Sequence, residues 1–247
     1  MAKFIYRNWR YAILVKQINR YDKYKDSGIE WIGKIPQHWN VERLKKIFTF
    51  GKGLSITKED LIEIGIPVIS YGQIHSKTNT GTQISDDLIR YVPETYLETN
   101  IQSLVNKGDF IFADTSEDIE GAGNCVFVDK QLTLFAGYHS IILKNKVHNY
   151  ILGKYLSYLF QTDLWRTQVR ANVNGIKVYS ISQKILKNIT ALVPQKNEQE
   201  QIADYLEKKC GEIDNIINDK ELLIEKFTEY KKSLIYECVT GKRKVAD

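Results

Sequence analysis

Residues 194–247 read PQKNEQEQIADYLEKKCGEIDNIINDKELLIEKFTEYKKSLIYECVTGKRKVAD, and this stretch decides the architecture of the chain. Apolar residues recur along it in alternating steps of four and three, which is the spacing of a helix that packs on another helix. Asn197, just after a proline, is a candidate cap with Glu200 three residues on, and Gly241 is a typical stop. We therefore expect one long, coiled-coil-forming helix over 196–240 and a tail over 241–247.

The apolar stripe of this helix predicts a partner. A helix near 40 residues would be about 60 Å long, more than one small domain can cover, and the chain offers no second long helix. Packing of the helix on its own domain is the alternative, but it leaves the far end uncovered. Lys209 and Lys220 interrupt a seam whose expected interface residues are Ile202, Leu206, Ile213, Ile216, Leu223, Phe227, Tyr230 and Leu234.

Composition limits the class of protein. The 247 residues could form one large domain or two modest ones. There is no apolar run of 18 residues, which argues against a membrane span, and the N-terminus lacks the cleavage site of a signal peptide. Three cysteines, far apart, fit neither a disulfide framework nor a zinc site, so we expect no metal and a cytoplasmic location.

Charge is unevenly distributed. From Pro194 onward there are 10 Lys+Arg and 12 Asp+Glu, a net of −2. Against the whole-chain totals of 35 and 30, this leaves residues 1–193 with 25 basic and 18 acidic residues, a net of +7. A basic globular part with an acidic helical tail points to a polyanion for the first and a protein for the second.

The remainder of the chain predicts a mixed α/β, or α+β, domain over 21–195, preceded by an extension over 1–20 whose order the sequence does not decide. Short β-branched or aromatic runs at 66–74, 108–114, 124–129 and 139–144 predict strands. Helices are expected over 41–50, over 150–170 and from Ser182, before a last strand at 188–194.

No constellation in the sequence argues for catalysis. The segment GAGNCV at 121–126 lacks the third glycine of a dinucleotide fingerprint, and no glycine-rich loop ends in Gly-Lys-Ser/Thr. The four histidines are dispersed without metal-ligand spacing. We therefore expect a binding module that takes no cofactor.

Polar and basic residues on glycine-bounded loops supply the groups that hold phosphates and read base edges. The candidate DNA-binding residues are Lys52, Ser55, Lys58, Tyr71, Gln73, His75, Lys77, Thr115, Ser116, Tyr138, His139, Arg166, Arg170, Asn172, Asn174 and Lys177. Ordinary loop chemistry is the alternative for any one of them, but as a set on the basic part of the chain they favour double-stranded DNA.

Three segments carry a family resemblance: YKDSGIEWIGKIPQHWNVERLK at 24–45, EQEQIADYLEKK at 198–209 and SLIYECVTGKRKV at 233–245. Together they resemble the specificity subunits of type I restriction–modification systems, and residues between them are similar to the target recognition domain of that family. The resemblance implies a non-catalytic subunit that reads half of a bipartite DNA site. It also implies that the long helix is a spacer on which methyltransferase subunits dock.

The chain departs from the family pattern of two recognition domains and two spacer helices, because it holds one of each. We therefore expect two copies to pair their long helices antiparallel and to read a palindromic, interrupted site. S-adenosylmethionine and ATP are expected only in the methyltransferase subunit and in a restriction subunit, where one exists. A non-DNA-binding assembly protein and a decayed fragment of a full-length subunit are the alternatives.

Overall fold

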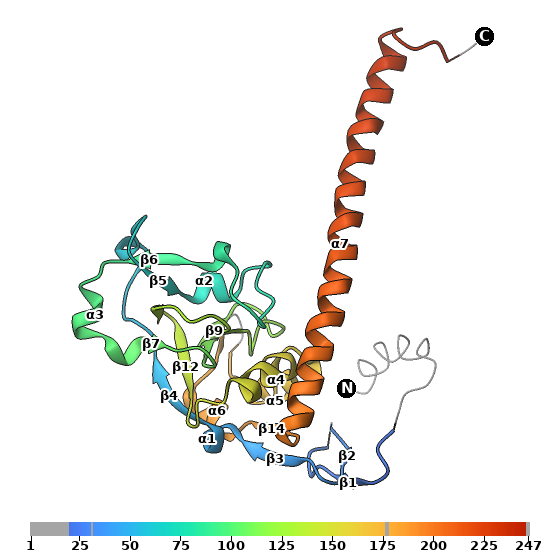
Figure 1. Cartoon of the computed structure of the whole chain (residues 1–247). Helices are drawn as coiled ribbons and strands as arrows, with labels where there is room; N and C mark the ends of the chain where they lie inside the picture. The colour runs from blue at the N-terminus through green and yellow to red at the C-terminus, as the bar shows by residue number, and fades with distance from the viewer. Residues whose placement is uncertain (1–19, 31, 176–177, 246–247) are drawn as a thin grey trace.

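The computed structural model describes residues 20–30, 32–175 and 178–245. Within these ranges a sheet-rich domain leads into one long helix, α7 (Lys196–Val239), of 44 residues. Only the first turns of α7 pack on the domain, and the rest projects away from it (Figure 1). A mixed α/β domain followed by a long helix is thus confirmed. The expectations for residues 1–19 and for Lys177 lie outside the described residues.

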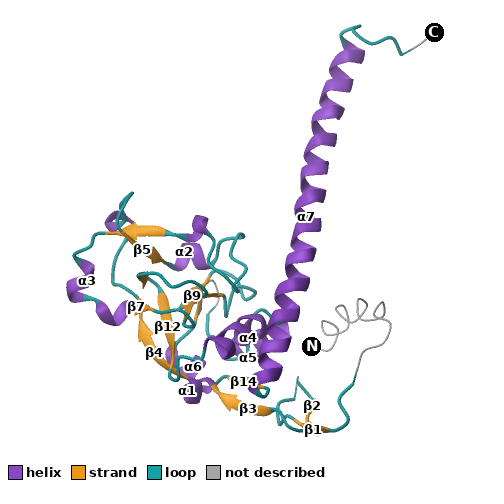
Figure 2. Cartoon of the chain, in the orientation of Figure 1, coloured by secondary structure: helices purple, strands orange, loops and turns teal. Residues whose placement is uncertain are grey.

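Two four-stranded sheets form the body of the domain (Figure 2). The first is antiparallel throughout and runs in the order β10 (Cys125–Phe127), β8 (Phe110–Ala113), β12 (Ser140–Asn145), β4 (Phe48–Lys52). The second, with β11 parallel to β5, runs in the order β6 (Arg90–Val92), β5 (Ile66–Ile69), β11 (Leu134–Ala136), β7 (Leu104–Val105).

Alternation along β8 explains how one strand serves two cores. Its four residues, Phe-Ile-Phe-Ala, are all fully buried, and successive side chains point to opposite faces of the sheet. Phe110 and Phe112 join the aromatic core beneath the helices, whereas Ile111 and Ala113 join a second core on the other face. The first sheet is therefore the central layer of the domain.

Helices α4 (Tyr150–Phe160) and α5 (Asp163–Arg170) close the aromatic core, and the Trp165 ring lies 4.2 Å from that of Phe160. Among the described residues, the remaining helical segments are single turns or little more. They are α1 (Leu44–Ile47), α2 (Tyr71–Ile74), α3 (Tyr96–Thr99), α6 (Gln183–Asn188) and the 3-10 turns Lys58–Asp60, Asp86–Leu88 and Ile101–Ser103.

Three two-stranded pairs complete the domain: β1 (Tyr24–Asp26) with β2 (Lys34–Pro36), β3 (Asn40–Arg43) with β14 (Thr190–Val193), and β9 (Thr115–Ser116) with β13 (Tyr179–Ser180). The pair β3–β14 brings the start of the domain beside the strand that leads into α7. The leading segment and the helix are thereby neighbours although they are far apart in sequence.

The root of α7 is anchored on α4. Ala203 is fully buried, and Ile202 packs against the aromatic core. Beside them the Lys154 ammonium donates to Asp204 at 2.8 Å and to Glu207 at 2.9 Å. Burial alone would lower the pKa of Lys154, but the bonds with these two carboxylates raise it well above its ordinary value.

Four local predictions are corrected. The expected helix over 41–50 is mostly two strands joined by the single turn α1, and the expected strand over 66–74 becomes helical at Tyr71. The helix expected over 150–170 is two helices, because the Thr162 hydroxyl caps a new one by accepting from the Trp165 N–H. Finally, α7 begins at Lys196 after Gln195, so Asn197 is not its cap.

Candidate nucleic-acid interface

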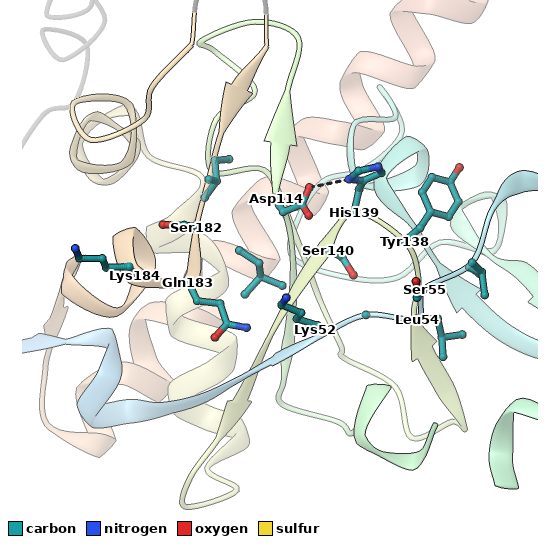
Figure 3. A pocket seen from close by; sticks show the side chains of 14 residues that line it. Lys52, Leu54, Ser55, Asp114, Tyr138, His139, Ser140, Ser182, Gln183 and Lys184 are labelled. Carbon is teal, nitrogen blue, oxygen red and sulfur yellow. Dashed lines mark hydrogen bonds and ion pairs between the residues drawn. The ribbon is translucent and has the colours of Figure 1, made fainter. Parts of the chain in front are cut away.

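A hollow of about 610 Å³ collects residues from four separate parts of the chain (Figure 3). It is called the first hollow here, and four of the predicted DNA-binding residues line it: Lys52, Ser55, Tyr138 and His139. Asp114, Gln183 and Lys184 also line it, although they were not among the predicted set. Basic, acidic, amide and hydroxyl groups thus share one surface depression.

Gly53 allows the backbone segments of the first hollow to approach each other. A β-carbon at this position would lie 1.9 Å from the Gly137 carbonyl oxygen and 2.3 Å from the Ser140 hydroxyl. The Gly53 N–H donates to the Ser140 carbonyl at 3.2 Å. Because only glycine fits this crossing, it holds Lys52 beside the 138–140 segment.

His139 is held in an unusual position over the first hollow. Its backbone φ is +52°, in the left-handed region, and its carbonyl accepts from the Asp114 N–H at 3.1 Å. The two side chains also meet, with 3.3 Å between Nδ1 of His139 and Oδ1 of Asp114. The pair presents an imidazole and a carboxylate to solvent at one point.

A second hollow adjoins the first. It is lined by Tyr71, His75, Ser116 and Arg166 from the predicted set, together with Glu117, Asp118, Glu120, Gly121 and Asn124. The rings of Tyr138, His139, Tyr71 and His75 connect the two hollows, with centroid separations of 6.0, 6.2 and 4.6 Å along the row. We call these four side chains the ring row.

Hydrogen bonds fix which nitrogen of His75 carries the proton. The Thr115 carbonyl can only accept, so Nε2 of His75, 2.9 Å away, donates to it. Asn124 accepts from Arg166 through Oδ1, which leaves its Nδ2 amide to donate to Nδ1 of His75 at 3.1 Å. The neutral form of the His75 ring therefore carries its proton on Nε2.

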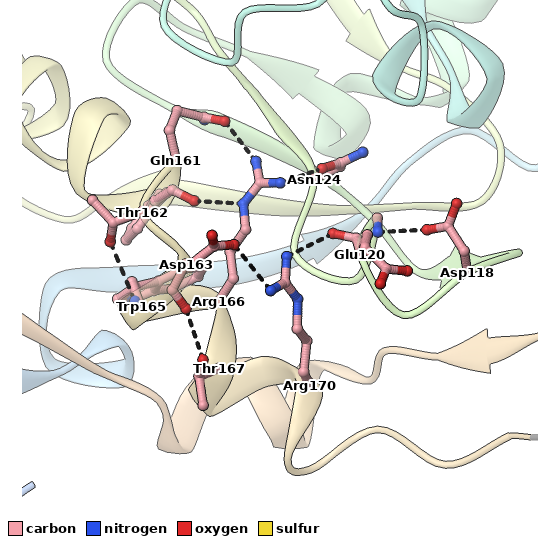
Figure 4. Close-up of polar contacts among 12 residues, drawn as sticks. Asp118, Glu120, Asn124, Gln161, Thr162, Asp163, Trp165, Arg166, Thr167 and Arg170 are labelled. Carbon is pink, nitrogen blue, oxygen red and sulfur yellow. Dashed lines mark hydrogen bonds and ion pairs between the residues drawn. The ribbon is translucent and has the colours of Figure 1, made fainter. Parts of the chain in front are cut away.

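The two predicted arginines are both engaged within the domain (Figure 4). Arg166 donates to Asn124 at 2.8 Å and to the Phe160 carbonyl at 2.9 Å, and burial lowers its pKa. Arg170 donates to Asp163 at 3.0 Å and to the Glu120 carbonyl at 3.0 Å. These bonds hold α5 against the acidic 117–120 loop, and a role for either arginine in DNA contact stays a prediction.

The other predicted residues are distributed around these hollows. Ser116 is buried, and Gln73 uses its side-chain oxygen to accept from the Ser70 N–H. Asn172 and Asn174 line a third hollow that shares Ser182 and Lys184 with the first. Thr115 is half-buried in β9, whereas Lys58, at the start of the 3-10 turn Lys58–Asp60, and Lys77, on a loop, are exposed.

Along α7 the expected interface residues divide into two groups. Ile202 and Leu206 are half-buried near the domain, and Ile202 packs on its core. Farther out the stripe is open, with 43% of Leu223 and 62% of Phe227 exposed. The remaining members of the stripe are Ile213, Ile216 and Tyr230, all exposed, and Leu234, which is half-buried.

Comparison with known proteins identifies the family. The family described as Type I restriction modification DNA specificity domain matches residues 36–226. The chain belongs to this family. Its members are DNA-recognition subunits rather than catalysts, so the expectation that the chain is not an enzyme is confirmed.

Two curated relatives from Methanocaldococcus jannaschii align with nearly the whole chain. The Type I restriction enzyme MjaVIII specificity subunit is 24% identical over 241 residues, which are 94% of this chain and 52% of the relative. The putative type I restriction enzyme MjaX specificity subunit is 24% identical over 231 residues, with corresponding shares of 92% and 51%. The chain thus spans about half the length of the curated relatives it matches.

Solved structures show the same fold. One, from work on complex assembly and conformational transition of the type I R-M system, has a TM-score of 0.61 at 13% identity over 87% of this chain and 48% of the other. The HsdS subunit from Thermoanaerobacter tengcongensis has a TM-score of 0.51 at 14% identity, over 78% of this chain and 41% of that subunit.

The described residues also bear on membrane proteins and on metal-binding proteins. In the part of the chain that the structure describes, no helix is both long enough and apolar enough to span a lipid bilayer. The same residues contain no group of three or more His, Cys, Asp or Glu side chains placed to hold a metal ion.

Proposed function

We propose that the chain is the DNA specificity subunit of a type I restriction–modification system and reads one half-site of a bipartite target. The observation that carries the proposal is the family match over 36–226, which spans the domain and most of α7. The three hollows and the ring row support it, because they gather amide, hydroxyl, imidazole and ammonium groups on one part of the domain.

The charges around the hollows suggest how the work of recognition is divided. Asp114, Glu117 and Asp118 repel phosphates but can accept from the exocyclic amino group of cytosine. Lys52 and Lys184, at the first hollow, are suited to phosphate contacts. We infer that the carboxylates face base edges and the lysines face the backbone.

In the same proposal, two chains pair through α7 in antiparallel fashion, so that two identical domains read inverted half-sites. The open stripe supports this pairing, since it leaves large apolar side chains without a cover. A helix pair would hold the two domains at a fixed separation, which a flexible linker cannot do.

The chemical steps belong to other subunits in this proposal. A methyltransferase subunit docks along α7, brings S-adenosylmethionine and flips the target base. A restriction subunit, where the system has one, brings the ATP-driven activity. The chain itself takes no cofactor and works on DNA in the cytoplasm.

Sedimentation of the purified chain, alone and with its candidate methyltransferase subunit, tests the assembly. We expect a particle of twice the 28.7 kDa chain mass that takes up the methyltransferase and binds duplex DNA more weakly as salt rises. A stable monomer that binds neither the methyltransferase nor DNA at low salt would contradict the proposal.

A further inference from the structure

Two arginines of α5 lie next to an acidic loop at the second hollow (Figure 4). Arg166 and Arg170 are four residues apart, so they project from the same face of the helix. The loop, residues 117–121, is called the acidic loop here. Its exposed carboxylates line the second hollow and belong to Glu117, Asp118 and Glu120.

The two ends of the acidic loop are joined through His75. Nε2 of His75 donates to the carbonyl of Thr115, just before the loop, at 2.9 Å, and Nδ1 accepts from the amide of Asn124, just after it, at 3.1 Å. Arg166 donates to Oδ1 of Asn124 at 2.8 Å, which fixes the orientation of that amide. A continuous chain of hydrogen bonds therefore runs from α5 to both ends of the loop.

Arg166 is itself fixed by two further bonds. Its Nε donates to the Phe160 carbonyl at 2.9 Å, and its Nη2 donates to the side chain of Gln161. All three nitrogen atoms of the guanidinium thus have acceptors within the domain, and all three acceptors are uncharged oxygens. Because no carboxylate neutralises it directly, its positive charge at the second hollow offsets part of the repulsion among the carboxylates of the acidic loop.

Arg170 holds the acidic loop itself. It donates to the Glu120 carbonyl at 3.0 Å and to Oδ1 of Asp163 at 3.0 Å, and only 22% of its side chain is exposed. Among the described residues, the bond to Glu120 is the only hydrogen bond that joins residues 117–121 to another helix or strand. Packing of Ile119 on the aromatic core is the other attachment of the loop.

We propose that Arg166 and Arg170 position the acidic loop for base reading and that neither contacts a DNA phosphate. A loop that is ordered before DNA binds loses less conformational entropy on binding. Its carboxylates can then meet an exocyclic amino group, such as that of cytosine, at a fixed place. This inference rests on the proposed function, because it takes the second hollow as part of the surface that reads DNA.

The surroundings of the two arginines favour positioning over phosphate contact. A phosphate at Arg166 would enter a hollow lined by three carboxylates, which repel it. Arg170 already has acceptors for both terminal nitrogens, and its Nε is buried. Lys52 differs from both, because it is exposed and its ammonium donates to no acceptor among the described residues.

Amide hydrogen exchange in the absence of DNA tests the hold on the loop. The amides to follow are those of Gly121, Ala122 and Asn124, which donate within the loop segment. We expect Arg170→Met to speed their exchange about tenfold, the factor for one lost hydrogen bond to a charged group. Lys45→Met, at an exposed lysine of α1, is the control. Equal exchange in Arg170→Met and wild type would overturn the proposal.

DNA binding separates positioning from phosphate contact. The probes are the duplex that the chain selects from a randomised pool and the single-base variants of that duplex. We expect Arg170→Met to lower the preference for one base pair of each half-site about tenfold, with an unchanged slope of log affinity against log salt. Lys52→Ala should do the reverse, lowering the slope by about one and keeping the base preference.

A change that preserves charge tests Arg166. Lysine keeps the positive charge but lacks the planar fork that reaches Asn124, Phe160 and Gln161 together. We therefore expect Arg166→Lys to relax the same base pair as Arg170→Met, again with an unchanged salt slope. Urea unfolding checks that each variant is folded under the conditions of the assay. Full base preference in folded Arg166→Lys would overturn the role given to Arg166.

The remaining outcomes separate this inference from the proposed function. A salt slope that falls by about one in Arg170→Met, with base preference intact, would show a phosphate contact and overturn the proposal. Faster exchange of the loop with base preference intact would overturn it as well, because the loop would then read no base. A wild-type chain that prefers no sequence would contradict the proposed function itself.

Discussion

Trp39 donates its indole N–H to the Glu198 carboxylate at 3.0 Å, and this bond ties the leading segment to the first turn of α7. The same carboxylate accepts from Nε2 of His38 at 2.8 Å and from the Tyr21 hydroxyl. Two of the segments that carry the family resemblance, 24–45 and 198–209, therefore meet at one side chain. Its position near the helix N-terminus also favours a negative charge.

Replacing Glu198 by Gln should destabilise the protein by about 1–2 kcal/mol at neutral pH, because three donors lose a charged acceptor. Urea unfolding measures the change. The matched control is Glu200→Gln, because Glu200 lies two residues farther along α7 and its side chain is exposed. Equal stability of the Glu198→Gln and Glu200→Gln proteins would contradict a structural role for the cluster.

The pH dependence of this effect has a definite sign. Burial would raise the pKa of Glu198, but the hydrogen bonds from Tyr21, His38 and Trp39 hold it below its ordinary value. A lowered folded-state pKa gives stability that is present above the unfolded pKa and is lost as pH falls through the folded one. The wild-type advantage over Glu198→Gln should therefore shrink as pH falls below about 4.

Lys154→Met should loosen the seat of α7 on α4. The change removes the bonds to Asp204 and Glu207 and should cost about 1 kcal/mol, since the ammonium is largely shielded while both carboxylates are exposed. Lys208→Met, on the exposed side of the helix, is the control. A double-mutant cycle with Glu207→Gln that shows no coupling energy between Lys154 and Glu207 would contradict a stabilising role for this ion pair.

Phe227→Asp should split the proposed dimer, because it would bury an unpaired charge in the seam. Leu222→Asp is a matched control on the other face of α7, where 51% of the side chain is exposed, against 62% for Phe227. Sedimentation should show the first variant as a monomer and the second as a dimer. Two dimeric variants would mean that the stripe is not the interface.

Lys52→Ala should weaken binding to all duplexes alike and lower the slope of log affinity against log salt by about one, as expected for one lost phosphate contact. Lys46→Ala is the control, because Lys46 lies on α1, lines none of the three hollows and pairs with Glu42 at 2.8 Å. If the salt slope of Lys52→Ala equals that of the wild type, Lys52 does not contact a DNA phosphate.

Tyr71→Phe tests base reading at the ring row. Burial and the nearby carboxylates of Glu117, Asp118 and Asp114 raise the pKa of Tyr71, so its hydroxyl stays protonated. Phenylalanine keeps the ring on His75 and removes only that hydroxyl. We expect specificity to relax at one position of each half-site by about 1–3 kcal/mol, measured by competition between single-base variants. A uniform loss across all sequences would contradict base reading by this group.

The sequence predicted the long helix well because its heptad signal extends over many turns, and Gly241, at φ +72°, ends it as expected. Local predictions failed where one or two residues redirected the chain. Gln73 and Ser70 close a capping turn that converts the end of a strand into α2, and Thr162 starts a second helix within one apolar pattern. Such short-range hydrogen bonds compete with periodicity and leave little trace in it.

Much of the candidate site could be predicted residue by residue but not as an arrangement. Lys52 and His139 were found from loop chemistry, yet their proximity depends on the backbone crossing at Gly53. Asp114 was missed, although it directly follows the buried strand β8 and faces His139. Arg166 was chosen for its charge, and only tertiary structure shows that its guanidinium group is engaged by Asn124.

Symmetric reading of DNA can be tested by selection from a pool of randomised duplexes with the chain and its methyltransferase subunit. We expect enrichment of one short sequence that recurs as an inverted repeat at a single fixed spacing, because two identical domains are held apart by paired α7 helices. Recovery of unselected sequences, or of half-sites at variable spacing, would contradict the claim that this chain is a symmetric DNA reader.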